Sequence, residues 1–180
     1  MARKKGLAGL SLGDLAARVG MRVPSLYSYF GSKHDIYDAM FAQGNDQFLQ
    51  HIRARRVGLP AEPRARLRAT FHTYFDFCTQ DPVRYQLLFQ RTIPGFEPSP
   101  GSYAKAVEAL RLFREDLADV GLVGDQQDED LLTALSTGLV SQQMANDPGG
   151  ERWARLIDVV ADMAYEHVTN KQRAQRGDPP

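Results

Sequence analysis

Apolar side chains recur every three to four residues along nearly the whole chain, and this spacing restricts the fold more than any other feature. It is the period of an α-helix that buries one face. No segment shows the sustained apolar/polar alternation, bounded by turn residues, that is typical of a strand. We therefore predict an all-α protein in which prolines and glycines separate the helices.

Breaks in this spacing give the expected order of helices. Two short helices are expected at residues 14–19 and 23–30, and Ser32 is expected to cap a long helix that continues to about Arg56. After the break at residues 58–60, apolar stripes indicate helices around residues 67–78, 83–90, 103–120, 131–140 and 153–163. Trp153 is expected to begin the last of them.

Composition excludes several classes of protein. With 180 residues and 43% hydrophobic residues, the chain can form a core. Its apolar runs are far shorter than the roughly 20 residues that a membrane-spanning helix needs, and the basic N-terminus precedes no apolar signal core. Cys78 is the only cysteine, so an internal disulfide is impossible and a reducing cytoplasm fits best.

The charge distribution is uneven although the net charge is zero. Residues 1–33 hold six basic side chains and one acidic one, a net charge of +5, which leaves −5 for the remainder. A basic head on an acidic body suggests that the head binds a polyanion. The alternative is a chance cluster on a solvated surface.

Residues 11–30 have the length and the central glycine of a helix-turn-helix. The second short helix offers Arg22, Ser25 and Ser28, whose side chains can hydrogen-bond base edges or phosphates in a major groove. Tyr27 and Tyr29 add hydroxyl groups. Lys33 adds a charge suited to phosphate, and Ser11 can cap the first helix. This arrangement favours binding of double-stranded DNA.

The same residues resemble a known family. Residues 10–21 (LSLGDLAARVGM) and 24–33 (PSLYSYFGSK) are similar to the signature of the tetracycline-repressor (TetR) family, with the glycine turn, the aromatic residues and the lysine at the expected offsets. A weaker similarity covers residues 137–140, 146–150 and 153. The resemblance implies a DNA-binding domain at residues 1–45 and a helical effector-binding and dimerisation domain at 46–170. The composition of residues 171–180 predicts a disordered tail.

The resemblance also implies roles for individual residues. Ser11, Tyr27 and Lys33 would contact phosphates, and Tyr29 would bridge to the DNA backbone. The residues nearest the base edges would be Arg22, Pro24, Ser25 and Ser28. The core between the helices would hold Leu15, Ala16, Val19, Leu26 and Phe30. Alternatively, the two tyrosines are packing residues with exposed hydroxyls, Arg22 is a solvated turn residue, and Lys33 only caps a turn.

In this family a further amphipathic helix precedes the helix-turn-helix, and only ten residues stand before Ser11. We therefore expect most of that first helix to be missing. Leu12, Leu26 and Phe30 should then be partly uncovered, and DNA binding should be weak, unless the true start lies upstream.

The body is rich in aromatic residues that could be plain core or could line a cavity for a small, mostly apolar ligand. The expected pocket residues are Phe71, Tyr74, Phe75, Cys78, Tyr85, Phe89, Tyr103 and Gln142.

The last two long helices are expected to form a homodimer interface, because small residues at helical spacing permit close approach. The expected interface residues are Ala134, Gly138, Ser141, Ala145, Trp153 and Val160, with Leu135 and Leu139 adding apolar area. The alternative is that this face packs within one chain. A dimer would read two half-sites of a palindromic operator.

We expect a repressor that a small-molecule effector releases from its operator, with no cofactor and no metal. The histidines lack metal-ligand spacing, and Cys78 has no general base nearby in the sequence, so we do not expect an enzyme. Besides an enzyme, the other alternative to a DNA-binding regulator is a helical, dimeric ligand-binding or interaction protein that has lost DNA binding.

Overall fold

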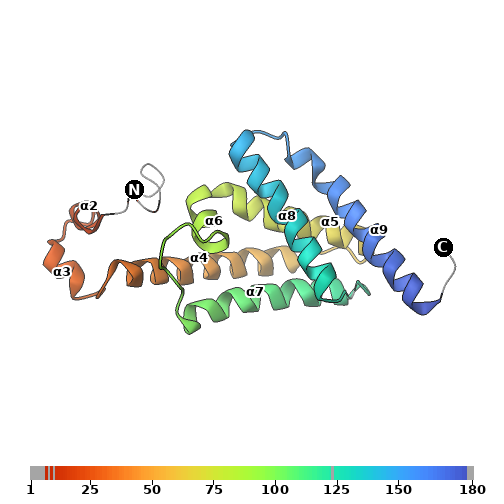
Figure 1. Ribbon diagram of the computed structural model, residues 1–180, viewed down its shortest axis with the longest axis horizontal. Helices are drawn as coiled ribbons and strands as arrows, with labels where there is room; N and C mark the ends of the chain where they lie inside the picture. Colours follow the sequence, from red (N-terminus) through yellow and green to blue (C-terminus); the bar gives the residue numbers. More distant parts are fainter. Residues whose placement is uncertain (1–6, 8, 10, 123, 178–180) are drawn as a thin grey trace. The chain divides into compact units, whose positions relative to one another are not determined.

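The computed structural model describes residues 7, 9, 11–122 and 124–177 (Figure 1). Within this part of the chain all regular structure is helical, which confirms the all-α prediction. The elements are α2 (Leu12–Arg18), α3 (Val23–Tyr27), α4 (Lys33–Arg56), α5 (Pro63–Gln80), α6 (Pro82–Phe89), α7 (Pro100–Ala118), α8 (Gln126–Asn146), the short 3₁₀ helix η1 (Ala154–Leu156) and α9 (Ile157–Arg176).

The chain divides into two compact units. Unit 1 comprises residues 1–49 and 81–109, and unit 2 comprises residues 50–80 and 110–180. Helices α4 and α7 each contribute residues to both units. Residues 81–109 join unit 1 because Leu87 is buried with Phe41 on α4, and Phe96 packs against the same cluster. The boundary between the compact units therefore differs from the predicted end of the DNA-binding domain at residue 45, which stays a prediction.

The core of unit 1 joins the two short helices to α4. Ala16 of α2, Leu26 of α3 and Ile36 of α4 are all buried in it, and so is Leu7. Leu26 is 5% exposed, so the prediction that it would be partly uncovered is wrong, whereas Leu12 and Phe30 are half-buried. Leu7 lies in the same cluster and covers part of the apolar surface there.

Side chains at the helix ends explain where α2 and α4 begin. The Asp14 N–H donates a 3.0 Å hydrogen bond to the Ser11 hydroxyl, and the Asp35 N–H donates one of 3.1 Å to the Ser32 hydroxyl. The Asp35 carboxylate accepts from the Ser32 N–H in return. Such reciprocal caps satisfy N–H groups that have no partner within the helix. The predicted caps and the predicted extent of α4 are therefore confirmed.

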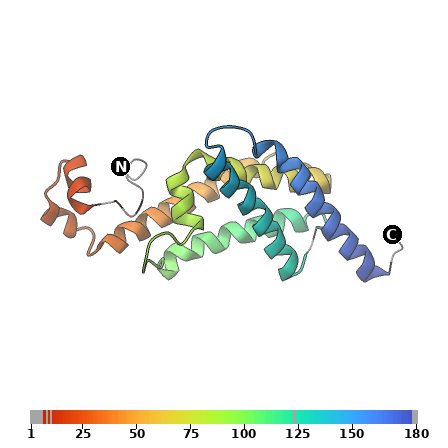
Figure 2. The same cartoon turned by 45° about the horizontal axis from the view of Figure 1, so that its top comes forward.

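In unit 2, α5 packs against α8 and α9, and the three helices lie side by side in both views (Figures 1 and 2). Gln143, which is 2% exposed, holds the turn between α8 and α9. Its side-chain oxygen accepts from the main-chain N–H of Trp153 and Ala154, at 3.0 and 3.3 Å. Trp153 therefore precedes η1 and does not begin the last long helix, which corrects the prediction.

The expected disordered tail is wrong for residues 171–176, which belong to α9. The ammonium group of Lys171 donates to both oxygens of Asp125 at 2.8 Å and to both oxygens of Asp128 at 3.0 Å, so this turn of α9 is held to the start of α8. The helix ends at Gly177, whose φ of 76° is the left-handed conformation that glycine adopts readily. Residues 178–180 lie outside the described residues.

Helix α7 buries a different face from the one its apolar stripe suggests. Tyr103, Val107 and Leu110 are 49–55% exposed, whereas Ser102 and Asp116 are buried. These two polar residues have partners. The Ser102 hydroxyl donates to Asp38 at 2.9 Å within unit 1, and Arg56 Nε lies 2.6 Å from Asp116 within unit 2. Partners distant in the sequence therefore determine which face of α7 is inside.

Candidate nucleic-acid interface

The connection between α2 and α3 is a tight glycine turn. Gly20 has a φ of 70°, and the Met21 N–H donates a 2.9 Å hydrogen bond to the Ala16 carbonyl oxygen. Ala16 and Leu26 are buried between the helices, and α2 packs against α3. The predicted helix-turn-helix is thereby confirmed as a local structure. Val19 is the exception among the predicted core residues, since it is 54% exposed just beyond the end of α2.

The residues predicted to meet DNA lie mostly on the surface. Tyr27 is 51% exposed and Tyr29 is 74% exposed, so neither ring is buried in the core, and their contact with DNA stays a prediction. Lys33 is half-buried. The remaining predicted contact residues are all exposed: Ser11, Arg22, Pro24, Ser25 and Ser28.

Helix α3 is shorter than predicted, because it ends at Tyr27 and not at residue 30. Ser28 is its C-terminal cap, and the Ser28 hydroxyl donates a 2.6 Å hydrogen bond to the carbonyl oxygen of Ser25. Arg22 is the N-terminal cap and makes no side-chain capping bond. The residues predicted to contact DNA in this segment therefore lie directly before α3, within it and directly after it.

Lys33, the first residue of α4, lies over the ring of Tyr37, with its ammonium nitrogen 5.5 Å from the ring centre. Tyr37 itself is buried, and its hydroxyl donates to the main-chain oxygen of Leu7 at 2.8 Å. Sequence reasoning missed Tyr37 as a residue that positions Lys33. The available signal was its spacing of four residues, which places both side chains on one face of the helix.

The exposed charges of this region have one sign. Arg18 and Arg22 are exposed beside the turn, and no acidic residue occurs from Leu15 to His34. The Asp35 carboxylate that follows is held in the cap of α4. The region therefore presents cations and hydroxyl groups without a competing carboxylate in that stretch.

The residues predicted for the effector pocket do not all lie in one unit. Tyr85, Phe89 and Tyr103 belong to unit 1 and the other five to unit 2. Tyr103 and Gln142 are exposed. Within unit 2, a cavity is lined by ten residues that include none of the predicted ones. The predicted set stays a prediction.

The small residues predicted for a dimer interface share one face of α8. At 100° per residue, Ala134, Gly138, Ser141 and Ala145 lie within a narrow sector opposite the buried Gln143. Ala134, Gly138 and Ala145 are exposed, and Ser141, Trp153 and Val160 are half-buried. Leu139 packs inside the protomer at 7% exposure, which corrects its assignment to the interface.

Among the residues that the structure describes, no three histidine, cysteine or carboxylate side chains come together as metal ligands. Across residues 11–122 and 124–177, no helix combines the length and the apolar character that crossing a membrane requires.

Solved structures share this fold. Regulatory protein SCO4313 has a TM-score of 0.73 at 19% identity, with 91% of this chain and 88% of that chain covered. The TetR family transcriptional regulator PfmR from Thermus thermophilus has a TM-score of 0.59 at 20% identity, with 91% of each chain covered. A helix-turn-helix followed by a helical body is thus the class of protein that the fold defines.

Sequence comparisons find similarity over part of the chain. Residues 1–40 match the family model described as bacterial regulatory proteins, tetR family. The HTH-type transcriptional activator FasR of Mycolicibacterium smegmatis is 30% identical over 86 residues, which cover 48% of this chain and 39% of FasR. The matched stretch thus spans well under half the length of that relative. The resemblance inferred from residues 10–33 is confirmed: the N-terminal part of the chain matches the model of the TetR family, and the relative that it matches over 86 residues is a transcriptional regulator.

Proposed function

We propose that the protein is a homodimeric regulator that binds double-stranded DNA through α3 and the residues flanking it. The observation that carries this proposal is the combination of a buried scaffold with an exposed polar face. Ala16 and Leu26 fix the angle between α2 and α3, while Arg22, Ser25 and Tyr27 remain accessible. A short helix held in this way can enter a major groove and present its N-terminal residues to base edges.

Phosphate contacts would set the register of this helix on the duplex. Arg18, Arg22 and Lys33 supply positive charge, and the exposed hydroxyl of Tyr27 supplies a neutral donor. Such contacts give affinity and orientation, whereas base edges give sequence preference. Two carboxylates of unit 1, those of Asp35 and Asp38, take part in other contacts. Asp35 is in the cap of α4, and Asp38 accepts from Ser99 and Ser102.

Dimerisation would supply the selectivity that one short helix lacks. The four small residues on the outer face of α8 permit close approach of a second copy, and Val159 and Met163 on α9 are 55% and 61% exposed. A two-fold dimer would present two copies of α3 to half-sites about 34 Å apart, or a multiple of that spacing. A palindromic operator in the cytoplasm is the expected target.

The second part of the proposal is that a small, mostly apolar effector releases the DNA, which makes the protein a repressor. Helix α4 runs without a break from Lys33, next to the DNA-contacting residues, to Arg56 in unit 2. It can therefore carry a shift from one unit to the other. An effector moves this equilibrium only by its difference in affinity for the two forms.

Salt titration of DNA binding tests the first part. The full chain is titrated onto a fluorescent random duplex at several salt concentrations, with the oligomeric state checked in parallel by sedimentation. Because each neutralised phosphate contributes a slope of about −0.9 to the plot of log affinity against log salt, several contacts predict a steep fall. A folded dimer that fails to bind at low salt would support the alternative of an interaction protein without DNA binding.

A reporter gene placed behind a selected operator tests the second part. Repression predicts lower expression when the protein is present and recovery when the effector is added. The relative FasR is named an activator, so activation of the reporter gene is the alternative outcome. Higher expression in the presence of the protein would contradict the repressor proposal while leaving the DNA-binding proposal intact.

A further inference from the structure

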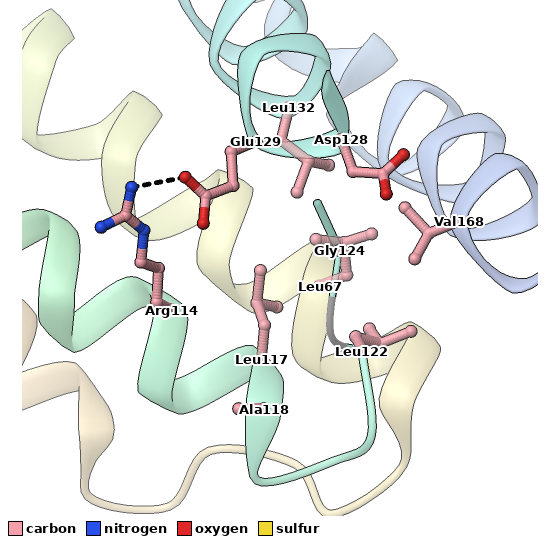
Figure 3. A pocket seen from close by; sticks show the side chains of 10 residues that line it. All are labelled: Leu67, Arg114, Leu117, Ala118, Leu122, Gly124, Asp128, Glu129, Leu132 and Val168. Carbon is pink, nitrogen blue, oxygen red and sulfur yellow. Dashed lines mark hydrogen bonds and ion pairs between the residues drawn. The ribbon is translucent and has the colours of Figure 1, made fainter. Parts of the chain in front are cut away.

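Unit 2 contains a cavity of about 240 Å³ where four helices meet (Figure 3). Helices α5, α7, α8 and α9 contribute to it, together with Leu122 and Gly124 between α7 and α8. Its apolar wall is built by Leu67, Leu117, Leu122, Leu132 and Val168. The exposed Ala118 also lines it, so this residue marks the rim.

The size of the cavity limits what it can hold. An engineered cavity of about 150 Å³ lined by apolar side chains stays dry and binds benzene. This cavity is larger, so it has room for one aromatic ring with a short arm of two or three atoms. The leucine and valine side chains favour an apolar body for such a ligand.

One edge of the cavity carries an ion pair. The Arg114 guanidinium lies 2.5 Å from the Glu129 carboxylate, and Figure 3 shows the pair at the side of the apolar wall. The Arg114 side chain is 55% exposed, whereas that of Glu129 is 32% exposed. Moving the Arg114 guanidinium from Glu129 into water therefore costs less free energy than moving the Glu129 carboxylate from Arg114 into water.

A second carboxylate lines the same cavity. Asp128 is 3% exposed, and its oxygens accept from Lys171 and from the main-chain N–H of Asp125. These partners occupy Asp128, and the Lys171 ammonium compensates its charge, so Asp128 is not free to bind a ligand. Glu129 is therefore the carboxylate of the lining that a ligand cation could reach by replacing Arg114.

We infer that this cavity is a binding site for a compact apolar amine in its ammonium form, with the ring among the leucines and the ammonium on Glu129. A ligand ammonium would replace Arg114, which returns to water. A ligand carboxylate would have to displace Glu129, the less exposed partner, from Arg114 and leave the Glu129 carboxylate without its cation. The inference specifies the effector of the proposed function, and it uses none of the aromatic residues first expected to line a pocket.

Calorimetry on the DNA-free, full-length protein tests the inference with three matched probes: phenethylammonium, 2-phenylethanol and phenylacetate. We expect phenethylammonium to bind about tenfold more tightly than the alcohol, because a charge-assisted hydrogen bond is roughly twice as strong as a neutral one, and phenylacetate to bind most weakly. Equal binding of the amine and the acid, or no binding of the amine, would overturn the inference.

Two variants locate the site. Ala118→Phe places a ring at the rim from an exposed position, so folding should persist while amine binding falls at least about tenfold. Ala174→Phe, at an exposed alanine that does not line the cavity, is its control and should bind normally. Amine binding that survives Ala118→Phe unchanged would place the ligand elsewhere and contradict the inference.

Glu129→Gln tests the role of the carboxylate. It should remove the preference for the amine over the alcohol, whereas Glu166→Gln, which breaks an ion pair with Arg64 outside the cavity, should keep it. A preference that persists in Glu129→Gln would refute the ammonium assignment. Because no DNA is present, these outcomes are independent of whether the protein binds an operator.

Discussion

The Tyr37 hydroxyl donates a 2.8 Å hydrogen bond to the main-chain oxygen of Leu7, which lies thirty positions earlier in the sequence. Both residues are buried, at 1% and 3% exposure. Leu7 belongs to the same apolar cluster as Ala16 and Leu26. The bond therefore ties Leu7 to α4 and helps to fix the apolar cluster that supports the helix-turn-helix.

Tyr37→Phe should reduce the free energy of unfolding by about 1–2 kcal/mol, because it leaves a buried carbonyl oxygen without its donor. Urea denaturation measures this loss. Tyr29→Phe removes a hydroxyl from a side chain that is 74% exposed and should change stability little. Equal effects of the two changes would show that the Tyr37 bond does not stabilise the fold.

Gly124→Ala should destabilise unit 2 by about 1–3 kcal/mol, as overpacking commonly does. A Cβ at this position would lie 2.5 Å from the Cβ of Asp128, which is fixed to the backbone of α8 and cannot swing away. Gly101→Ala is the control, since a Cβ there meets nothing within 4 Å. Thermal unfolding of both variants checks the prediction, and a neutral Gly124→Ala would contradict the packing seen here.

We expect the protein to lose stability in acid because of the Asp38 carboxyl group. Burial raises the pKa of this carboxyl, but hydrogen bonds from the Ser99 N–H, the Ser99 hydroxyl and the Ser102 hydroxyl outweigh burial and leave the pKa below its ordinary value. An acid whose pKa is lower in the folded state stabilises the fold above the unfolded pKa, which is about 4. This contribution is lost as the pH falls through the folded pKa.

Asp38→Asn should therefore lower the free energy of unfolding by about 1 kcal/mol at neutral pH, and the difference from the wild type should shrink below about pH 4. Chemical denaturation across this pH range measures both effects. Ser102→Ala removes one of the donors and should give a smaller change of the same form. A difference that stays constant with pH would rule out the charged form of Asp38 as its cause.

Substitutions at Gly138 test the stability of the single chain and its dimerisation separately. A Cβ at this position meets nothing within 4 Å in the protomer, so Gly138→Ala should raise helix stability by up to about 1 kcal/mol. Gly138→Leu should weaken the proposed dimer by holding the two backbones apart, whereas Thr133→Leu, at an exposed position on the flank of α8, should not. Sedimentation of the three variants checks this, and an intact Gly138→Leu dimer would move the interface elsewhere.

Features set by local chemistry were predictable from the sequence. The extent of α4 followed from Ser32 and from the glycine and proline after Arg56, and the exposed face of the helix-turn-helix followed from its short motif. Glycine turns and side-chain caps act over a few residues, so the sequence displays them directly.

Features set by distant partners were not predictable. The inward face of α7 depends on Asp38 and Arg56, more than fifty residues earlier, and so the apolar stripe indicated the wrong face. The cavity in unit 2 gathers single side chains from separate helices, and the aromatic content of the body gave no hint of its position. Lys171 was assigned to the tail because its carboxylate partners lie on another helix.

The most direct test of the central claim is the affinity of a Tyr27→Ala/Lys33→Ala double variant for duplex DNA, measured by fluorescence anisotropy at fixed salt. We expect a fall of at least about tenfold and a salt slope that is shallower by about one for the lost lysine contact, with helix content and dimerisation unchanged. Tyr103→Ala/Lys105→Ala is the control, because Tyr103 is 55% exposed and Tyr27 is 51% exposed. Undiminished affinity in the folded Tyr27/Lys33 variant would contradict the assignment of this face to DNA.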